Sequence, residues 1–216
     1  RRGALWGGRM TPQAVIFDIG NVLIGWQPEH YYDRVYGEDR RRALFAEVDL
    51  HWMNERVDRG EPFTQVIYET ADAHPKWRAE IRDWHDSWIE LATPVIDHSV
   101  ALLRRLRAKG VPVHCLTNFG VDSYAYAQTQ FDFLNEFDIE FVSGRMQVTK
   151  PDPRIYEMVE DRLALAPGAI LFADDREANI KVAETRGWQA HLFEHPQGWA
   201  DRLVAARLLS ADEAAA

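Results

Sequence analysis

The chain has 216 residues, of which 46% are hydrophobic and 27% charged, and its formal net charge is -9 at pH 7. These proportions exclude an intrinsically disordered chain, and the length allows one core plus a modest insertion. The negative charge argues against a broad nucleic-acid-binding surface, so any anionic ligand needs a dedicated local site. We therefore expect no nucleic-acid partner.

The cysteine content, the apolar segments and the two ends of the chain give expectations about the cellular compartment of the protein. The single cysteine, Cys115, excludes an internal disulfide, and its apolar surroundings predict a buried structural thiol. No apolar segment is long enough to span a bilayer, so we expect a cytoplasmic protein with no membrane partner. We interpret residues 1–9, before Met10, as a leader remnant or a start-site artefact, with neither alternative favoured by the sequence. The last residues, 211–216, are expected to fray.

Short apolar runs recur along the chain and predict a parallel sheet. The first run, 14–18, ends in Asp18 and is typical of a strand buried on both faces. Similar runs at 111–117, 139–142, 169–174 and 189–193 bring the total to about five candidate strands. Helical patterns at 100–109, 153–163 and 177–186 alternate with them. This alternation predicts a Rossmann-like, doubly wound α/β fold.

The stretch 27–92 interrupts the alternation. It contains no convincing strand, and its periodicity predicts helices at 39–48, 51–59, 63–73 and 77–91. We therefore predict an α/β core domain of residues 11–26 and 93–210 and an inserted α-helical cap of residues 27–92.

Polar residues of phosphate chemistry follow the predicted strands. Asp18 ends the first, Thr117-Asn118 the second and Asp174-Asp175 the fourth, while Lys150 follows the third after a short loop. Ligands of open parallel sheets bind at the carboxyl ends of the strands. One acid there is commonly only a loop cap, but all of these groups in this order predict an active site.

The same residues carry a family resemblance. Four segments match the motifs of the haloacid dehalogenase superfamily in order and placement: Phe17-Asp18-Ile19-Gly20-Asn21-Val22-Leu23, Leu116-Thr117-Asn118, Lys150-Pro151 and Asp174-Asp175-Arg176-Glu177-Ala178-Asn179. The resemblance implies a hydrolase with a three-layer core and a cap that closes over the site.

The residue types suit phosphoryl transfer through an aspartyl-phosphate. Asp18 is the candidate nucleophile. The approach of this carboxylate to a negatively charged phosphate needs cations beside the phosphate oxygens. Lys150 and a metal ion would supply that positive charge. The Thr117 hydroxyl and backbone N–H groups around Asn118 and Gly20 would position the phosphoryl group.

Clustered acids predict a divalent cation. Without one, Asp174 and Asp175 would raise the pKa of Asp18 and one another, so we expect Mg²⁺ bound by Asp18, the Gly20 carbonyl and these two acids. Asp175 is the favoured direct ligand, because Asp174 could instead cap the helix that begins near residue 177. We interpret Asn179 as a support behind the ligands.

Gly20 departs from the family pattern, in which most phosphatases carry an aspartate two residues after the nucleophile as general acid and base. Loss of that acid typically costs a factor of ~10²–10⁴. The sequence therefore predicts a bias towards good leaving groups, unless a cap histidine, an ordered water or another group supplies the proton. First motifs of the form Asp-x-Gly-Asn resemble those of sugar-phosphate phosphatases.

Three functions remain open. The first is a Mg²⁺-dependent phosphatase acting on a small phosphorylated metabolite such as a sugar phosphate. The second is a 2-haloacid dehalogenase-type hydrolase with Asp18 as nucleophile, although that branch generally replaces the paired acids with uncharged residues. The third is a non-catalytic binding protein that keeps the fold. The oligomeric state is expected to be a monomer or homodimer.

Several cap residues invite a role at the site. Trp52, Asn54, Arg56, Asp58 and Arg59 share one short predicted helix, and some could reach a substrate when the cap closes. Core packing of the tryptophan and solvation of the arginines are the favoured interpretations. Trp84 and Trp88 share a helix face and predict packing within the cap.

Overall fold

The computed structural model describes residues 5–6 and 9–215, so most of the segment 1–9 lies outside the described residues. A five-stranded sheet forms the centre of the molecule, with the order β7-β6-β3-β8-β9 and parallel pairing throughout. Its strands are β3 (Ala14–Phe17), β6 (Val113–Thr117), β7 (Ile139–Val142), β8 (Ile170–Asp174) and β9 (Gln189–Leu192). The predicted α/β fold is confirmed.

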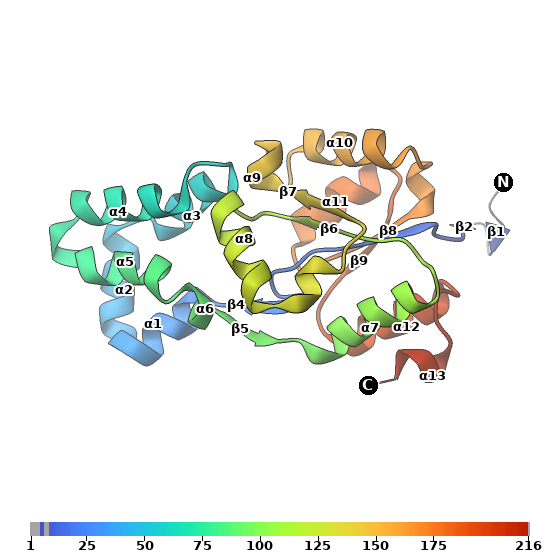
Figure 1. Cartoon of the computed structure of the whole chain (residues 1–216), viewed down its shortest axis with the longest axis horizontal. Helices are drawn as coiled ribbons and strands as arrows, with labels where there is room; N and C mark the ends of the chain where they lie inside the picture. Colours follow the sequence, from blue (N-terminus) through green and yellow to red (C-terminus); the bar gives the residue numbers. More distant parts are fainter. Residues whose placement is uncertain (1–4, 7–8, 216) are drawn as a thin grey trace.

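Helices cover both faces of the sheet (Figure 1). Val15 and Phe17 point to one face, where they pack with α7 (Asp97–Ala108), α8 (Val121–Gln130) and α12 (Pro196–Ala205). Ile16 points to the other, towards α10 (Pro153–Leu163) and α11 (Glu177–Thr185). Successive strand residues face opposite sides, so a strand covered on both sides must be apolar throughout. This explains the unbroken apolar run before Asp18.

Short elements complete the core. They are β1 (Leu5–Trp6) and β2 (Arg9–Met10), which pair with each other, α9 (Ser143–Met146), α13 (Ala211–Ala214), and the 3₁₀ turns at Asp132–Asn135 and Pro167–Ala169. The expected fraying of 211–216 is wrong for residues 211–214. Ser210 and Glu213 form a capping box there, and Ala214 is buried.

The predicted burial of Cys115 is confirmed, and burial raises the pKa of its thiol to about 12.

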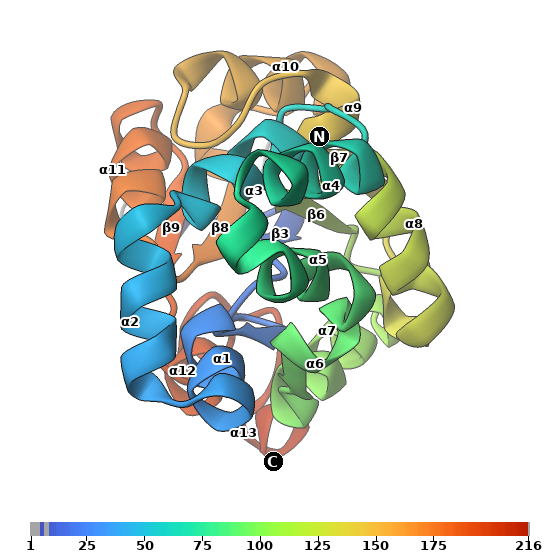
Figure 2. The same ribbon diagram turned by 90° about the vertical axis from the view of Figure 1, so that its left-hand side faces the viewer.

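Between β4 (Ile24–Trp26) and β5 (Ala92–Val95) the chain forms a helical layer beside the sheet, seen in front of it in Figure 2. Its elements are α1 (Pro28–Tyr36), α2 (Glu38–Glu47), α3 (Leu50–Asp58), α4 (Phe63–Ala73), a 3₁₀ turn (Pro75–Trp77), α5 (Arg78–Asp86) and α6 (Trp88–Leu91). We call residues 27–91 the cap. None of the described helices is long and apolar enough to cross a bilayer.

Two features of the cap differ from expectation. Helix α1 was not predicted, although Pro28 stands at its first turn, where proline is favoured. The single helix expected at 77–91 is broken at Ser87, which leaves the helical region (φ -112°, ψ 22°) and donates a hydrogen bond to Asp83 Oδ1.

Strands β4 and β5 form an antiparallel ribbon that joins the cap to the core. Ile24 pairs with Val95 and Trp26 with Ala92, with an irregularity between the two pairs. The chain therefore passes into the cap and back out of it at neighbouring positions.

Candidate active site

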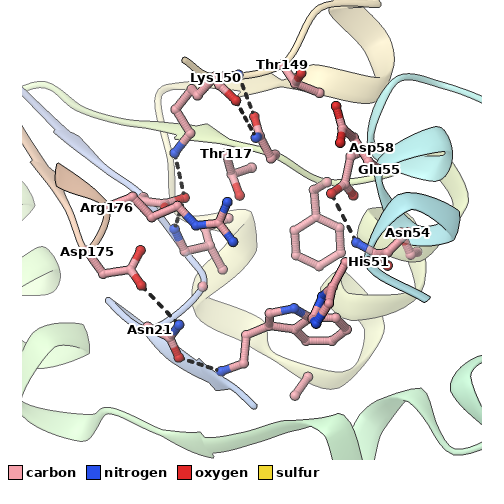
Figure 3. Close-up of a pocket in the computed structure, with 18 of the residues that line it drawn as sticks. Asn21, His51, Asn54, Glu55, Asp58, Thr117, Thr149, Lys150, Asp175 and Arg176 are labelled. Atoms are coloured by element: carbon pink, nitrogen blue, oxygen red, sulfur yellow. Dashed lines mark hydrogen bonds and ion pairs between the residues drawn. The ribbon is translucent and has the colours of Figure 1, made fainter. Parts of the chain in front are cut away.

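A cavity of about 500 Å³ lies between the carboxyl ends of β3, β6 and β8 and the cap (Figure 3). Asp18, Gly20, Thr117, Asn118, Lys150 and Asp175 from the predicted site all line it, together with Asn179. Asp174 lies just behind this wall and is fully buried. The structure thus brings together all the site residues that the sequence singled out.

Asp18 is held at the floor of the cavity and is only 7% exposed. Its Oδ1 accepts a hydrogen bond from the Ile19 N–H (2.8 Å) and lies 3.0 Å from Lys150 Nζ. Its Oδ2 receives no hydrogen bond from any described residue. Burial raises the pKa of Asp18 to about 7 against the opposing effect of Lys150. One carboxylate oxygen is therefore fixed and the other is available for a reacting atom or a metal.

Lys150 uses its ammonium group entirely within the protein. Nζ donates to the Leu116 carbonyl (2.8 Å) and to Asp174 Oδ2 (2.6 Å), and it pairs with Asp18. Burial alone would lower the pKa of Lys150, but Asp174 and Asp18 outweigh burial and raise it. The lysine therefore stays charged and offsets the two buried carboxylates.

Asn118 fixes the loop that carries this lysine. Its Nδ2 donates to the Lys150 carbonyl (2.9 Å), and its Oδ1 accepts from the Lys150 N–H (2.8 Å). Both polar atoms of the Asn118 side chain are thus used to position Lys150 rather than to bind a ligand. Thr117 differs, because its hydroxyl faces the cavity and has no hydrogen-bond partner among the described residues. It remains free to contact a ligand.

Asp18, Asp174 and Asp175 each offer a carboxylate oxygen, and these oxygens all lie within 4.8 Å of one another. Such a set of hard oxygen donors fits a divalent cation such as Mg²⁺. Asp174 is heavily engaged: it accepts from the Arg176 N–H (2.8 Å), from Asn179 Nδ2 at both oxygens (2.9 Å each) and from Lys150. Asn179 therefore supports Asp174, as expected.

Asp175 is less engaged than Asp174. It accepts one side-chain hydrogen bond, from Asn21 Nδ2 to Oδ2 (3.1 Å), and burial raises its pKa. Asn21 has φ 56°, a left-handed conformation that asparagine tolerates, and its Oδ1 accepts from the Trp26 N–H (2.8 Å). The sequence pointed only to the backbone here and missed this side chain, although an asparagine in a tight turn is a recognisable signal.

The cap supplies the opposite wall. Trp52, Asn54 and Asp58 of α3 line the cavity, whereas Arg56 and Arg59 do not. The core packing expected of Trp52 is wrong, because half of this residue is exposed. These arginines instead form ion pairs with Glu61 and Glu55.

Aromatic rings complete the wall. Trp84 and Trp88 are buried and pack against Trp26, as predicted for the cap interior, and they also border the cavity with Phe119. The cavity thus combines a charged floor with an aromatic cap side.

The fold and the site together define a class: a capped α/β enzyme with a buried aspartate, a lysine and an acidic pair at one edge of a parallel sheet. The chain belongs to the haloacid dehalogenase-like hydrolases, whose family model matches residues 12–185. The resemblance seen in the sequence motifs is confirmed, and the protein is a hydrolase.

Relatives within this family include both phosphatases and dehalogenases. Acyl-CoA dehydrogenase family member 10 of Mus musculus is 28% identical over 207 residues, which cover 88% of this chain but only 18% of the mouse protein. Phosphorylated carbohydrates phosphatase of Thermotoga maritima is 21% identical over 81% of this chain and 82% of its own. An (S)-2-haloacid dehalogenase of Pseudomonas fluorescens is 31% identical over 56% of this chain and 52% of its own.

Solved structures show the same fold. The haloacid dehalogenase family enzyme BT-2542 of Bacteroides thetaiotaomicron superposes with a TM-score of 0.71 at 20% identity, covering 89% of this chain and 98% of that one. That enzyme has also been solved in complex with magnesium and inorganic phosphate.

Proposed function

We propose that the protein is a Mg²⁺-dependent phosphatase that hydrolyses a small phosphorylated metabolite through an aspartyl-phosphate on Asp18. The observation that carries the proposal is the acidic cluster, in which oxygens of Asp18, Asp174 and Asp175 lie within 4.8 Å of one another. Sugar phosphates are candidate substrates, since the Thermotoga maritima relative is a phosphatase of phosphorylated carbohydrates.

Each residue has a role in this reaction. Asp18 attacks phosphorus, and Lys150 offsets the negative charge that would otherwise raise the pKa of the nucleophile. The Thr117 hydroxyl donates a hydrogen bond to a phosphate oxygen. Asp18, Asp175 and the Gly20 carbonyl would hold Mg²⁺, with Asp174 behind them, and the cation would stabilise charge on the phosphate when bound.

Dehalogenation is the less favoured reaction. Halide departs without a proton and without a metal, so a dehalogenase would have no use for the acidic pair at Asp174 and Asp175. The dehalogenase relatives argue for the shared nucleophile rather than for the shared substrate, because nucleophilic attack by an aspartate serves both reactions.

The test is phosphate release from a panel of phosphorylated sugars, aryl phosphates, nucleotides and 2-haloacids, each with Mg²⁺ and with a chelator. We expect phosphate release that requires Mg²⁺ and falls at least a hundredfold in Asp18→Asn, because the amide cannot form the phospho-enzyme. Acid quenching should trap the phosphorylated protein in wild type only. Halide release without phosphate release, or retained activity in Asp18→Asn, would overturn the proposal.

A further inference from the structure

The family's usual proton donor is missing at Gly20, and the cavity wall opposite the nucleophile holds an acid. Asp58, at the end of α3, is half-buried and lines the cavity. Figure 3 shows it across the cavity from Arg176 and Asp175. A carboxyl group on that side would face the ester oxygen of a phosphate bound between Asp18 and the cap.

Contacts with the core fix Asp58 in place. Ser143 Oγ donates to the Asp58 backbone carbonyl (2.5 Å) and accepts from the Phe119 N–H (2.9 Å). The neighbouring turn is tightly packed, since a Cβ on Gly60 would lie 2.7 Å from the Gly144 carbonyl oxygen. The end of α3 is therefore docked on α9 and on the loop that follows β6, and the acid does not depend on the cap alone for its position.

The other cap acids at the cavity are already engaged. Asp49 accepts from the Trp52 N–H (2.8 Å) at the start of α3, and Glu55 is paired with Arg59. Asp58 accepts one side-chain hydrogen bond, from Asn54 Nδ2 to Oδ2 (3.0 Å), and forms no ion pair within the described part of the chain. Its other oxygen is thus available to a substrate.

From these contacts, and given the phosphatase function proposed above, we propose that Asp58 is the proton donor to the leaving group and takes over the role of the acid absent at position 20. An Asp18 oxygen attacks phosphorus, and the bond from phosphorus to the ester oxygen breaks. The ester oxygen keeps the electron pair of that bond and takes a proton from the Asp58 carboxyl group. Water then attacks the aspartyl-phosphate and gives a proton to the Asp58 carboxylate. Breaking the bond to Asp18 restores both side chains and releases inorganic phosphate.

The electrostatic surroundings suit this role. Burial raises the pKa of Asp58 to about 7, with Arg176 opposing, Glu55 adding, and the Asn54 hydrogen bond and Lys150 opposing. A general acid works best when its pKa lies near the working pH.

The experiment compares two substrates that differ in their need for a proton. 2,4-Dinitrophenyl phosphate has a leaving group that departs as an anion, whereas glycerol phosphate releases a basic alkoxide. In Asp58→Asn we expect single-turnover phosphoryl transfer from glycerol phosphate to fall ~10²–10⁴-fold, while the same step with the aryl ester stays within about threefold. Asp72→Asn, at a cap aspartate paired with Arg78 and Arg82 away from the cavity, is the matched control.

A rescue variant separates a chemical role from a structural one. A Cβ at Gly20 has room, since its nearest neighbour is the Trp26 Cβ at 3.6 Å. Gly20→Asp should therefore restore part of the glycerol phosphate activity of Asp58→Asn. Equal losses on both substrates, no loss on either, or the same selective loss in Glu55→Gln or His51→Gln but not in Asp58→Asn would overturn the proposal. Absence of any phosphate release by wild type would instead reject the phosphatase function itself.

Discussion

At the level of single residues, Lys150 joins the groups on which the chemistry depends. Its ammonium contacts Asp18, Asp174 and the Leu116 carbonyl, and the whole residue is only 4% exposed. Charge on the nucleophile and stability of the buried site are therefore linked through one side chain. A substitution there should affect both properties.

We predict that Lys150→Met abolishes turnover and also destabilises the fold by about 3–5 kcal/mol, because it leaves two buried carboxylates without their partner. Urea unfolding followed by circular dichroism would measure the loss of stability. The surface lysine Lys76, paired with Glu47, offers a control, since Lys76→Met should change stability by about 1 kcal/mol or less. Wild-type activity in Lys150→Met would reject its role in catalysis.

The two adjacent acids should differ in their contribution to metal binding. Asp174 is held by Lys150, Asn179 and the Arg176 N–H, whereas Asp175 accepts one side-chain hydrogen bond. We therefore predict that Asp175→Asn weakens Mg²⁺ binding more than Asp174→Asn does, and that the second variant loses more stability. Calorimetric titration with Mg²⁺ gives the affinities and thermal unfolding gives the stabilities. Equal Mg²⁺ affinities in the two variants would contradict this ordering.

At the level of elements, the contact between α3 and the core relies on backbone surfaces without side chains. A Cβ on Gly60, just after α3, would lie 2.7 Å from the Gly144 carbonyl oxygen of the core. A Cβ on Gly120 would lie 2.4 Å from Val57 Cγ1 and 3.2 Å from the Val57 carbonyl oxygen. Glycine at these two positions allows the cap helix to lie directly on the core loops.

We predict that Gly120→Ala, whose added Cβ would meet Val57 of α3, costs about 1–3 kcal/mol of stability, as is typical of overpacking, and lowers the activity that needs the cap in place. Hydrogen exchange should show weaker protection at the end of α3. Gly168→Ala is the matched control, because its Cβ would have no neighbour closer than 3.9 Å. Unchanged stability and hydrogen exchange in Gly120→Ala would contradict this prediction, because they would show that α3 accommodates the added methyl group.

At the level of the whole molecule, the sequence predicted the five sheet strands and the floor of the site. These features rest on local signals: apolar runs, helix starts and polar residues at strand ends. Helix α1 and the break at Ser87 escaped prediction, because aromatic packing and a local hydroxyl contact decide them. The role of Asn118 as a clamp on Lys150 also escaped, since 32 residues separate the two in sequence.

The ribbon of β4 and β5 has a consequence for how such a protein can change over time. Trp26 and Ala92 are register partners, so the segment between them begins and ends at one place on the core. A tight turn could join the same two strands as an ordinary hairpin without altering any other connection. The segment between the two strands can therefore differ in length or sequence while the nucleophile Asp18 and its partner Lys150 keep their places on the core.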